Sequence, residues 1–339
     1  MNITFFVGNG FDINLGLKTR YTDFYPYYLS KGHNDLLSNA ISKDFGNWAD
    51  LELELGKCLA QLGVASLPEF LDSKTTLEKD LVEYLDLESK RISFTNQNIM
   101  TEFQGKVVDF YKEFSEQDKM DYQAWCRAAQ DSINYQFVTF NYTTILDQII
   151  AQAKKLVPFS THKAPANYTH HDRLSKLIHI HGTLENDMIL GINDPSQIGN
   201  PDLREQNEIT DYLVKSSINE LLGNQRTRQV QELINDSVYV CVYGMSLGDT
   251  DSLWWEYIFQ WLISKPSHRL VLYIFDEISV PSGPEKLRKI RYWQNIFFKK
   301  VHAPGPVTLE VRKRIIVLIK SQIFNFENIC LKGEPDEQT

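Results

Sequence analysis

The chain begins with an apolar run that ends abruptly in two glycines. Residues 2–7 are continuous strand formers, and Gly8, Asn9 and Gly10 follow at once. Such a run is typical of a parallel strand that is covered on both faces. The glycines permit a tight turn and a close approach of the backbone to a ligand, and a helix starting there would favour an anion. Because Ile13 stands where G-x-G-x-x-G has its third glycine, the stretch fits both a phosphate-binding turn and an ordinary strand-turn-helix junction.

Length and composition indicate an ordinary soluble globular protein. The 339 residues suffice for one large or two moderate domains, and 42% hydrophobic with 23% charged residues is a usual balance. The net charge of -9, without a long lysine or arginine tract, disfavours nucleic acid and anionic membranes as partners. We expect no membrane span, because no apolar stretch is long enough, and no signal peptide, because no basic region precedes the first apolar run. The four cysteines are far apart and form no CxxC pair, which predicts thiols in a reducing cytoplasm.

Strand-like and helix-like segments alternate through most of the chain. After the first strand, the predicted strands are residues 137–140, 177–181, 188–190, 238–243, 270–275 and 296–301. The polar stretch 160–175 is predicted to be a surface loop, and residues 307–325 a closing helix. This alternation predicts an α/β fold with a Rossmann-like parallel sheet and helices on both faces.

Residues 33–132 interrupt this alternation. Leu51, Leu55 and Leu59 recur at helical offsets, and strand-like runs are absent from the stretch. We therefore predict a helical insertion or subdomain over 33–132. The Rossmann-like nucleotide-binding domain would comprise 1–32 and 133–330, and 331–339 would be a disordered tail.

Polar clusters follow four of the predicted strands. They are Gly8-Asn9-Gly10, Phe140-Asn141-Tyr142, His181-Gly182-Thr183 and Gly244-Met245-Ser246. In parallel sheets, ligands bind beyond the carboxyl ends of the strands. We therefore expect these widely separated segments to converge on one site.

In this order the segments resemble the AbiH family of phage abortive-infection proteins, over nearly the whole chain. The matching motifs are Gly8-Asn9-Gly10-Phe11-Asp12, Gly16-Leu17-Lys18-Thr19, Trp48 with Asp50-Leu51-Glu52, Phe140-Asn141-Tyr142-Thr143, His179-Ile180-His181-Gly182 and Tyr243 to Asp251. That family looks like a distant relative of the sirtuins. The resemblance implies a Rossmann-like, sirtuin-like domain that binds NAD or a related nucleotide.

The resemblance also implies roles for single residues. Asn141 matches the asparagine of the sirtuin strand-end motif, and His181 the histidine before its glycine, so these two are the candidate catalytic residues. The implied nucleotide-binding residues are Gly8, Asn9, Gly10, Asp12, Thr19, Gly244, Ser246 and Asp249. Among these, Gly244 to Ser246 match the late Gly-x-Ser loop that holds the adenosine end. No metal is expected.

Two departures from the sirtuin pattern bear on the reaction. The paired CxxC motifs of the sirtuin zinc ribbon are absent, and Asn9 replaces the small residue between the two glycines. Protein deacetylation is therefore disfavoured. The expected function is that of a cytoplasmic anti-phage effector, an NAD glycohydrolase that takes NAD as its substrate and releases nicotinamide and ADP-ribose. The alternatives are a sensor that binds NAD or ADP-ribose without turnover and, less attractive at this net charge, a nuclease toxin. A homo-oligomer and a phage-derived activator are left open as partners.

The chemistry of this cleavage suits an amide and an imidazole, because nicotinamide leaves a cationic pyridinium as a neutral molecule. Asn141 could orient water or the ribose hydroxyls, or it could simply cap the following helix. His181 could accept a proton, or it could be a strand-end histidine bonded to backbone.

Other polar residues near these motifs have equally ordinary explanations. Asp12 and Asp249 could contact ribose hydroxyls, or they could cap helices. A metal-binding pair of His179 and His181 is disfavoured, because no Glu or Cys lies at a zinc spacing. Glu52 shares a helix face with Trp48; it could reach the active cleft, but a position at the surface or the core edge is favoured.

Overall fold

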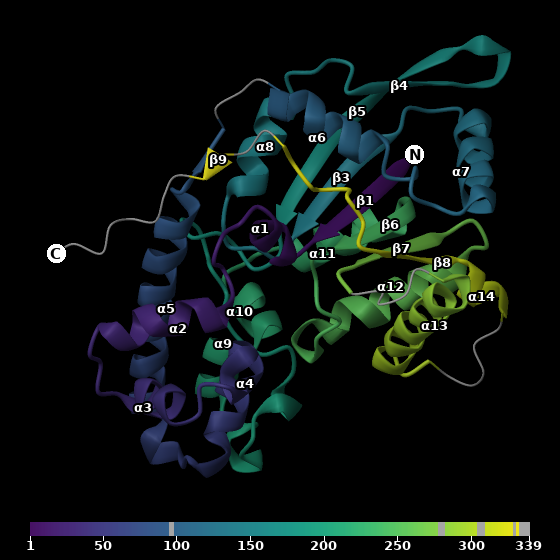
Figure 1. The fold of residues 1–339 in the computed structure, drawn as a ribbon. Coiled ribbons are helices and arrows are strands. Elements are labelled where there is room, and N and C mark those ends of the chain that lie inside the picture. The colour runs from purple at the N-terminus through teal and green to yellow at the C-terminus, as the bar shows by residue number, and fades with distance from the viewer. Residues whose placement is uncertain (95–97, 277–281, 304–308, 328–329, 332–339) are drawn as a thin grey trace.

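A seven-stranded sheet organises the molecule (Figure 1). The computed structural model describes residues 1–94, 98–276, 282–303, 309–327 and 330–331. The strands of the sheet are β1 (Asn2–Val7), β3 (Asn134–Thr139), β4 (Ser160–Lys163), β5 (Thr169–His179), β6 (Ser237–Tyr243), β7 (Arg269–Ile274) and β8 (Ile315–Ile319). Their order is β4-β5-β3-β1-β6-β7-β8, and every neighbouring pair is parallel except β4 with β5. The fold is therefore α/β, with a mostly parallel sheet. A separate two-stranded pair joins β2 (Ile92–Ser93) to β9 (Cys330–Leu331).

The predicted first strand is confirmed as the central strand β1, which pairs with β3 on one side and β6 on the other. Its apolar side chains alternate between two cores. Phe5 packs with one buried cluster, whereas Phe6 packs with another on the opposite face. A strand in this position is buried on both sides, which explains why its sequence is continuously apolar.

Helices cover both faces of the sheet, as the sequence predicted. The helices are α1 (Gly10–Asn14), α2 (Tyr21–Ser30), α3 (Leu36–Lys43), α4 (Leu51–Cys58), α5 (Leu67–Ser89), α6 (Asn98–Val108), α7 (Glu116–Ala128), α8 (Ile145–Ala153), α9 (Asn207–Leu213), α10 (Lys215–Leu221), α11 (Arg226–Asn235), α12 (Ser252–Ser264), α13 (Gly283–Lys300) and α14 (Leu309–Lys313). One face packs against Phe103 of α6 and Ile149 of α8. The other packs against Ile234 of α11, Trp255 of α12 and Phe297 of α13.

A third buried cluster forms the core of a helical region beside the sheet, at the lower left of Figure 1. It combines α2, α3, α4 and α5 with Leu203 and with Leu213 of α9. In contrast, α6 and α7 contribute Phe103 and Tyr122 to a core of the sheet. Packing thus joins chain segments from both sides of the predicted boundaries 33 and 132, and those domain limits stay a prediction.

Two predictions near the C-terminus are wrong. Residues 296–301 were expected to be a strand but belong almost entirely to α13, where Gln294, Phe297 and Phe298 lie on one buried helical face. The closing helix predicted over 307–325 is the short helix α14 followed by β8. The run Ile315–Ile319 is wholly apolar, which suits a strand covered on both faces better than an amphipathic helix.

Two further corrections concern the middle of the chain. Residues 160–175, predicted as a loop, are mostly a hairpin of β4 and β5. Their polar character reflects an edge position, where one side of the pair faces solvent. Residues 188–190 form no strand, although the Ile189 amide donates to the His181 carbonyl at 2.8 Å. Of the predicted tail, residues 332–339 lie outside the described residues.

The carboxyl ends of four central strands lie in register. Val7 of β1 is paired with Thr139 of β3 and with Tyr243 of β6, and Thr139 is paired with His179 of β5. From β1 the chain proceeds outward to β3 and β5, and later returns to the other side of β1 for β6. The sheet thus has a reversal of strand order beside these ends, the position at which open α/β sheets bind ligands. None of the described helices is long and apolar enough to cross a membrane.

Candidate active site

The four predicted polar clusters meet at this edge of the sheet. Because the strand ends are in register and neighbouring strands lie about 4.8 Å apart, the residues that follow them form one row. His181 follows β5, Asn141 follows β3, Gly8 follows β1 and Gly244 follows β6. The four strand ends therefore lie side by side, as expected, and their convergence on one site stays a prediction.

Backbone packing accounts for the glycines of the first turn. The Gly8 amide donates to the Tyr243 carbonyl at 2.9 Å, and the Gly10 amide donates to the Gly244 carbonyl at 2.7 Å. A Cβ on Gly10 would lie 2.5 Å from the Gly244 Cα, and Gly244 itself has a φ of +66°. The turn after β1 and the turn after β6 therefore approach so closely that neither tolerates a side chain at these positions.

Asn9 and Thr19 are joined by two hydrogen bonds. The Thr19 hydroxyl donates to Asn9 Oδ1 at 2.5 Å, and Asn9 Nδ2 donates to the Thr19 carbonyl at 2.7 Å. These two predicted nucleotide-binding side chains thus fix the segment that links α1 to α2.

Asp12 and Asn141 are buried together beneath the row of strand ends, with 1% and 6% of their surface exposed. Asp12 Oδ2 accepts a hydrogen bond from the Thr143 hydroxyl at 2.6 Å. Burial raises the pKa of Asp12 to about 6, although Thr143 and Asn141 oppose the shift. By strict geometry, Asp12 Oδ1 and both amide atoms of Asn141 have no hydrogen-bond partner among the described residues, although the Asn141 amide lies close enough to Asp12 to act on its pKa. The cap of α8 is Thr144, so Asn141 is not the helix cap that its position also suggested.

His181 is 5% exposed and stands at the end of β5. Its Nε2 lies 3.2 Å from Asp251 Oδ1 and 3.4 Å from Lys215 Nζ, whereas its Nδ1 has no partner among the described residues. Burial and the Lys215 ammonium lower the pKa of His181 to about 4, against the opposing pull of Asp251. His181 is therefore a neutral base at physiological pH. Gly182 has a φ of +75°, which turns the chain directly after the ring.

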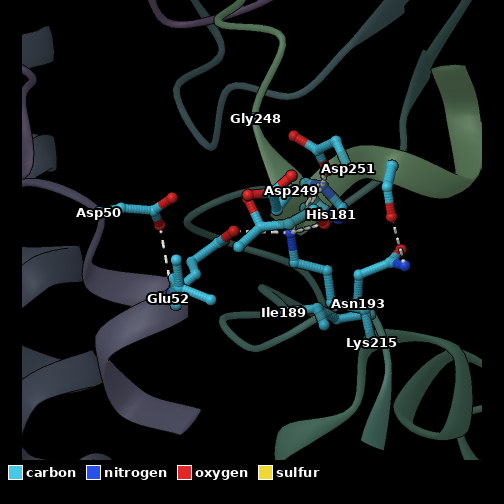
Figure 2. A network of polar contacts seen from close by, with 12 residues as sticks. Asp50, Glu52, His181, Ile189, Asn193, Lys215, Gly248, Asp249 and Asp251 are labelled. Carbon is cyan, nitrogen blue, oxygen red and sulfur yellow. Dashed lines mark hydrogen bonds and ion pairs between the residues drawn. The ribbon is translucent and has the colours of Figure 1, made fainter. Parts of the chain in front are cut away.

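Lys215 lies at the centre of a buried polar network (Figure 2). Its ammonium donates to Glu52 Oε2 at 2.7 Å, to the Thr250 carbonyl at 3.3 Å and to Asp251 Oδ1 at 3.4 Å. Burial lowers the pKa of Lys215, but Asp251 and Glu52 outweigh it and the pKa lies above its ordinary value. In turn, burial raises the pKa of Asp251, but Lys215 and His181 hold it well below its ordinary range.

Glu52 comes to this network from α4 in the helical region. It was expected at the surface or the core edge, but it is 7% exposed and bonded to Lys215. Asp50 caps α4 by accepting from the Leu53 amide, which fixes the helix start beside the strand ends. The Tyr142 hydroxyl lies 3.3 Å from Glu52 Oε1. Burial and Asp251 raise the pKa of Glu52 to about 7, while Lys215 opposes the shift.

Sequence reasoning did not identify Lys215, and it favoured the surface or the core edge for Glu52. Lys215 is flanked by Leu213, Val214 and Ile218, and a lysine within such an apolar stretch is the signal that could have indicated a buried ammonium. Nothing local distinguishes Asp251 from a helix cap, because its partners are distant in the chain.

Ser246 and Asp249 are both exposed, and Asp249 forms an ion pair with Lys300 of α13. His179 is also committed elsewhere, because its Nδ1 contacts the Asn141 carbonyl at 3.0 Å and its Nε2 contacts Asp147 Oδ2 at 2.7 Å. Within the described ranges, no three His, Cys, Asp or Glu residues are grouped so as to hold a metal ion.

The raised pKa of Glu52 predicts a pH dependence of stability. Glu52 ionises near 4.5 in the unfolded chain and near 7 in the folded one, so the folded state holds one more proton between these values. Stability from this group is fully present below pH 4.5 and is lost as the pH rises to about 7, by at most about 3 kcal/mol.

We expect the free energy of unfolding of wild type, minus that of Glu52→Gln, to fall between pH 4.5 and 7 and to stay level above. Urea unfolding at a series of pH values measures this difference. His181 and Asp12 titrate in both proteins and largely cancel. A difference that is flat across this range would contradict the assignment.

The arrangement offers a neutral imidazole held beside an ion-paired lysine at the end of one strand, and an amide next to a buried carboxyl group at the ends of the neighbouring strands. Comparison with known families gives one match: the family model described as bacteriophage abortive infection AbiH matches residues 4–273. No curated protein matches the chain.

Proposed function

The chain belongs to the AbiH family of bacteriophage abortive-infection proteins, and we propose that it serves this defence by hydrolysing NAD to nicotinamide and ADP-ribose. The family indicates a role in abortive infection against phage. The cleavage of NAD, and the assignment of His181 and Asn141 as its catalytic residues, are our proposal.

One observation carries this proposal. Nine buried side-chain polar atoms among the described residues have no hydrogen-bond partner, and four of them belong to Asp12, Asn141 and His181. Buried polar groups are normally paired, so unpaired ones that follow neighbouring strand ends are candidates for binding a ligand. These residues were singled out from the sirtuin-like order of motifs, which is an independent line of support.

The strand order supports a Rossmann-like domain. Apart from the antiparallel edge strand β4, the third, second, first, fourth, fifth and sixth parallel strands in the sequence lie side by side in that order. Dinucleotide-binding folds have the same order and bind their ligand at its reversal point. The proposed site lies at this point, between the ends of β5, β3, β1 and β6.

The proposed residues fit the chemistry of NAD cleavage. The bond between ribose C1′ and the nicotinamide nitrogen breaks, and its electron pair neutralises the pyridinium. The oxygen of a water molecule bonds to C1′, and the proton released passes to His181 and then to solvent. Asn141 can donate to and accept from that water or a ribose hydroxyl, and Asp12 can accept from a second hydroxyl.

The burial of these side chains bears on regulation. With His181 and Asn141 no more than 6% exposed, a dinucleotide reaches them only when the segments over the strand ends separate. A closed resting site suits an effector that must spare the NAD of an uninfected cell, and a phage-derived activator would open it.

The proposal predicts that nicotinamide release depends on both catalytic residues. NAD and nicotinamide should be measured in phage-infected cells that carry wild type, His181→Ala or Asn141→Ala, and with the purified proteins. We expect NAD to fall in infected wild-type cells and release to drop by about 100-fold or more in either variant. His171→Ala is the matched control, because His171 is exposed on β5 away from the strand ends, and it should behave as wild type.

Three outcomes would oppose this proposal. Protection against phage with unchanged NAD would refute cleavage, and full release from His181→Ala would refute the assigned base. Calorimetric binding of NAD without nicotinamide release would instead favour the alternative function, a sensor that signals to a partner or an oligomer.

A further inference from the structure

The protons of Lys215 can be assigned from its surroundings. An ammonium has three N–H donors, and three oxygens surround this one: Glu52 Oε2, the Thr250 carbonyl and Asp251 Oδ1. The Thr250 carbonyl can act only as an acceptor. The two carboxyl groups also act only as acceptors when they are ionised. The fourth neighbour, His181 Nε2 at 3.4 Å, is therefore not needed as an acceptor.

The same reasoning decides the tautomer of His181. Nε2 lies 3.2 Å from Asp251 Oδ1, and this contact is a hydrogen bond only if Nε2 carries the proton. The other tautomer would place two acceptors against each other at Nε2. It would also bury an unpaired N–H at Nδ1, which has no partner among the described residues. Orphaned buried N–H donors are rarer in proteins than under-used acceptors.

We propose that Asp251 and Lys215 are positioning residues that hold His181 as its Nε2–H tautomer, so that the lone pair at Nδ1 is the proton acceptor of the site. Asp251 accepts from Nε2–H, and Lys215 keeps Asp251 ionised and in place. The catalytic part of this inference rests on the proposed hydrolysis of NAD, whereas the tautomer does not.

The proposal also gives the helical region a role in the site. Of the three oxygens, Glu52 Oε2 is the closest to the Lys215 ammonium. Glu52 belongs to α4, a helix of the helical region beside the sheet. Glu52 therefore fixes Lys215 from the side opposite Asp251, as Figure 2 shows. The chain positions its base with groups from α4, from the start of α10 and from the 3-10 helix Asp249–Asp251.

Nitrogen-15 NMR of the full chain labelled at histidine tests the tautomer directly. At pH 8, where Glu52 is mostly ionised, we expect Nδ1 of His181 to have the shift of an unprotonated ring nitrogen and Nε2 that of a protonated one. The signals are assigned by their loss in His181→Gln. A protonated Nδ1 in wild type would overturn the proposal, whatever the enzymatic activity.

Two variants of Asp251 test its positioning role. Asp251→Asn retains an oxygen that can accept from Nε2–H and should keep the tautomer, whereas Asp251→Leu removes the acceptor and should give a mixture. If nicotinamide is released, Asp251→Leu should lower kcat about 10-fold or more with little change in KM, and Asp251→Asn should retain more activity. An unchanged tautomer in a folded Asp251→Leu would contradict the role.

The two proposals can fail separately. The expected tautomer together with unchanged NAD in phage-infected wild-type cells would leave the positioning intact and refute the hydrolysis of NAD. Release that depends on His181 with Nδ1 protonated would do the reverse.

Discussion

Replacing Lys215 by methionine is expected to destabilise the protein by about 3–5 kcal/mol, the usual consequence of removing one partner of a buried ion pair. Lys215 is 6% exposed, and its ammonium is the shared partner of Glu52 and Asp251. Methionine has a similar length and fills the same space, so the loss is electrostatic. Without Lys215, Glu52 must take up a proton, and Asp251 is left with His181 as its only other partner among the ion pairs described. Urea unfolding at pH 7 measures the change.

Two comparisons make the Lys215 result interpretable. Lys90→Met removes an ion pair of 2.5 Å to Asp86, but those side chains are 69% and 49% exposed, so its effect should stay within about 1 kcal/mol. The double variant Lys215→Met with Glu52→Gln should recover part of the lost stability, because one buried charge is removed with its partner. If Lys215→Met were as stable as Lys90→Met, the ion pairs of Lys215 would not be buried from water, and the prediction would be wrong.

The central strands could be predicted because their local sequence alone indicates a strand that is buried on both faces. The continuous apolar character of β1 follows from burial on both faces, and the strands near 137–140, 238–243 and 270–275 share it. The failures near the C-terminus have the opposite origin. Phe297 and Phe298 are adjacent apolar residues that suit a strand or a helix equally, and only packing against α12 and the sheet decides between them.

Part of the candidate site could also be predicted, namely the residues that follow strands. Asn141 and His181 follow strands, and strand ends in a parallel sheet meet at one edge, so their convergence could be inferred. Glu52 is brought there by α4, which packs in the third core, and Lys215 follows directly after Leu213 and Val214 of that core, so no local pattern specifies that their side chains meet. The positions of the charged groups around His181 therefore follow only from tertiary structure, whereas the position of His181 itself follows from the strand that precedes it.

The glycines of the first turn raise a related question, because both a bound pyrophosphate and a close backbone contact would require them. In the folded chain, Gly244 carbonyl oxygen accepts from the Gly10 amide, and a Cβ on Gly244 would lie 2.7 Å from the Phe11 nitrogen. The contact between the two turns thus suffices to require glycine even without a ligand. This contact joins the turns at the carboxyl ends of β1 and β6, next to the proposed site.

Gly244→Ala is therefore expected to lower the free energy of unfolding by about 2–5 kcal/mol without any ligand present. A positive φ costs alanine about 1–2 kcal/mol, and forcing a methyl group against backbone costs about 1–3 kcal/mol more. Gly223→Ala is the matched control, because Gly223 has a φ of +67° but nothing within 4 Å of its Cβ, so it should show the first cost alone. Urea unfolding of both variants measures the difference. If the two were equally stable, backbone packing would not explain Gly244, and the requirement for glycine would have to come from the bound nucleotide.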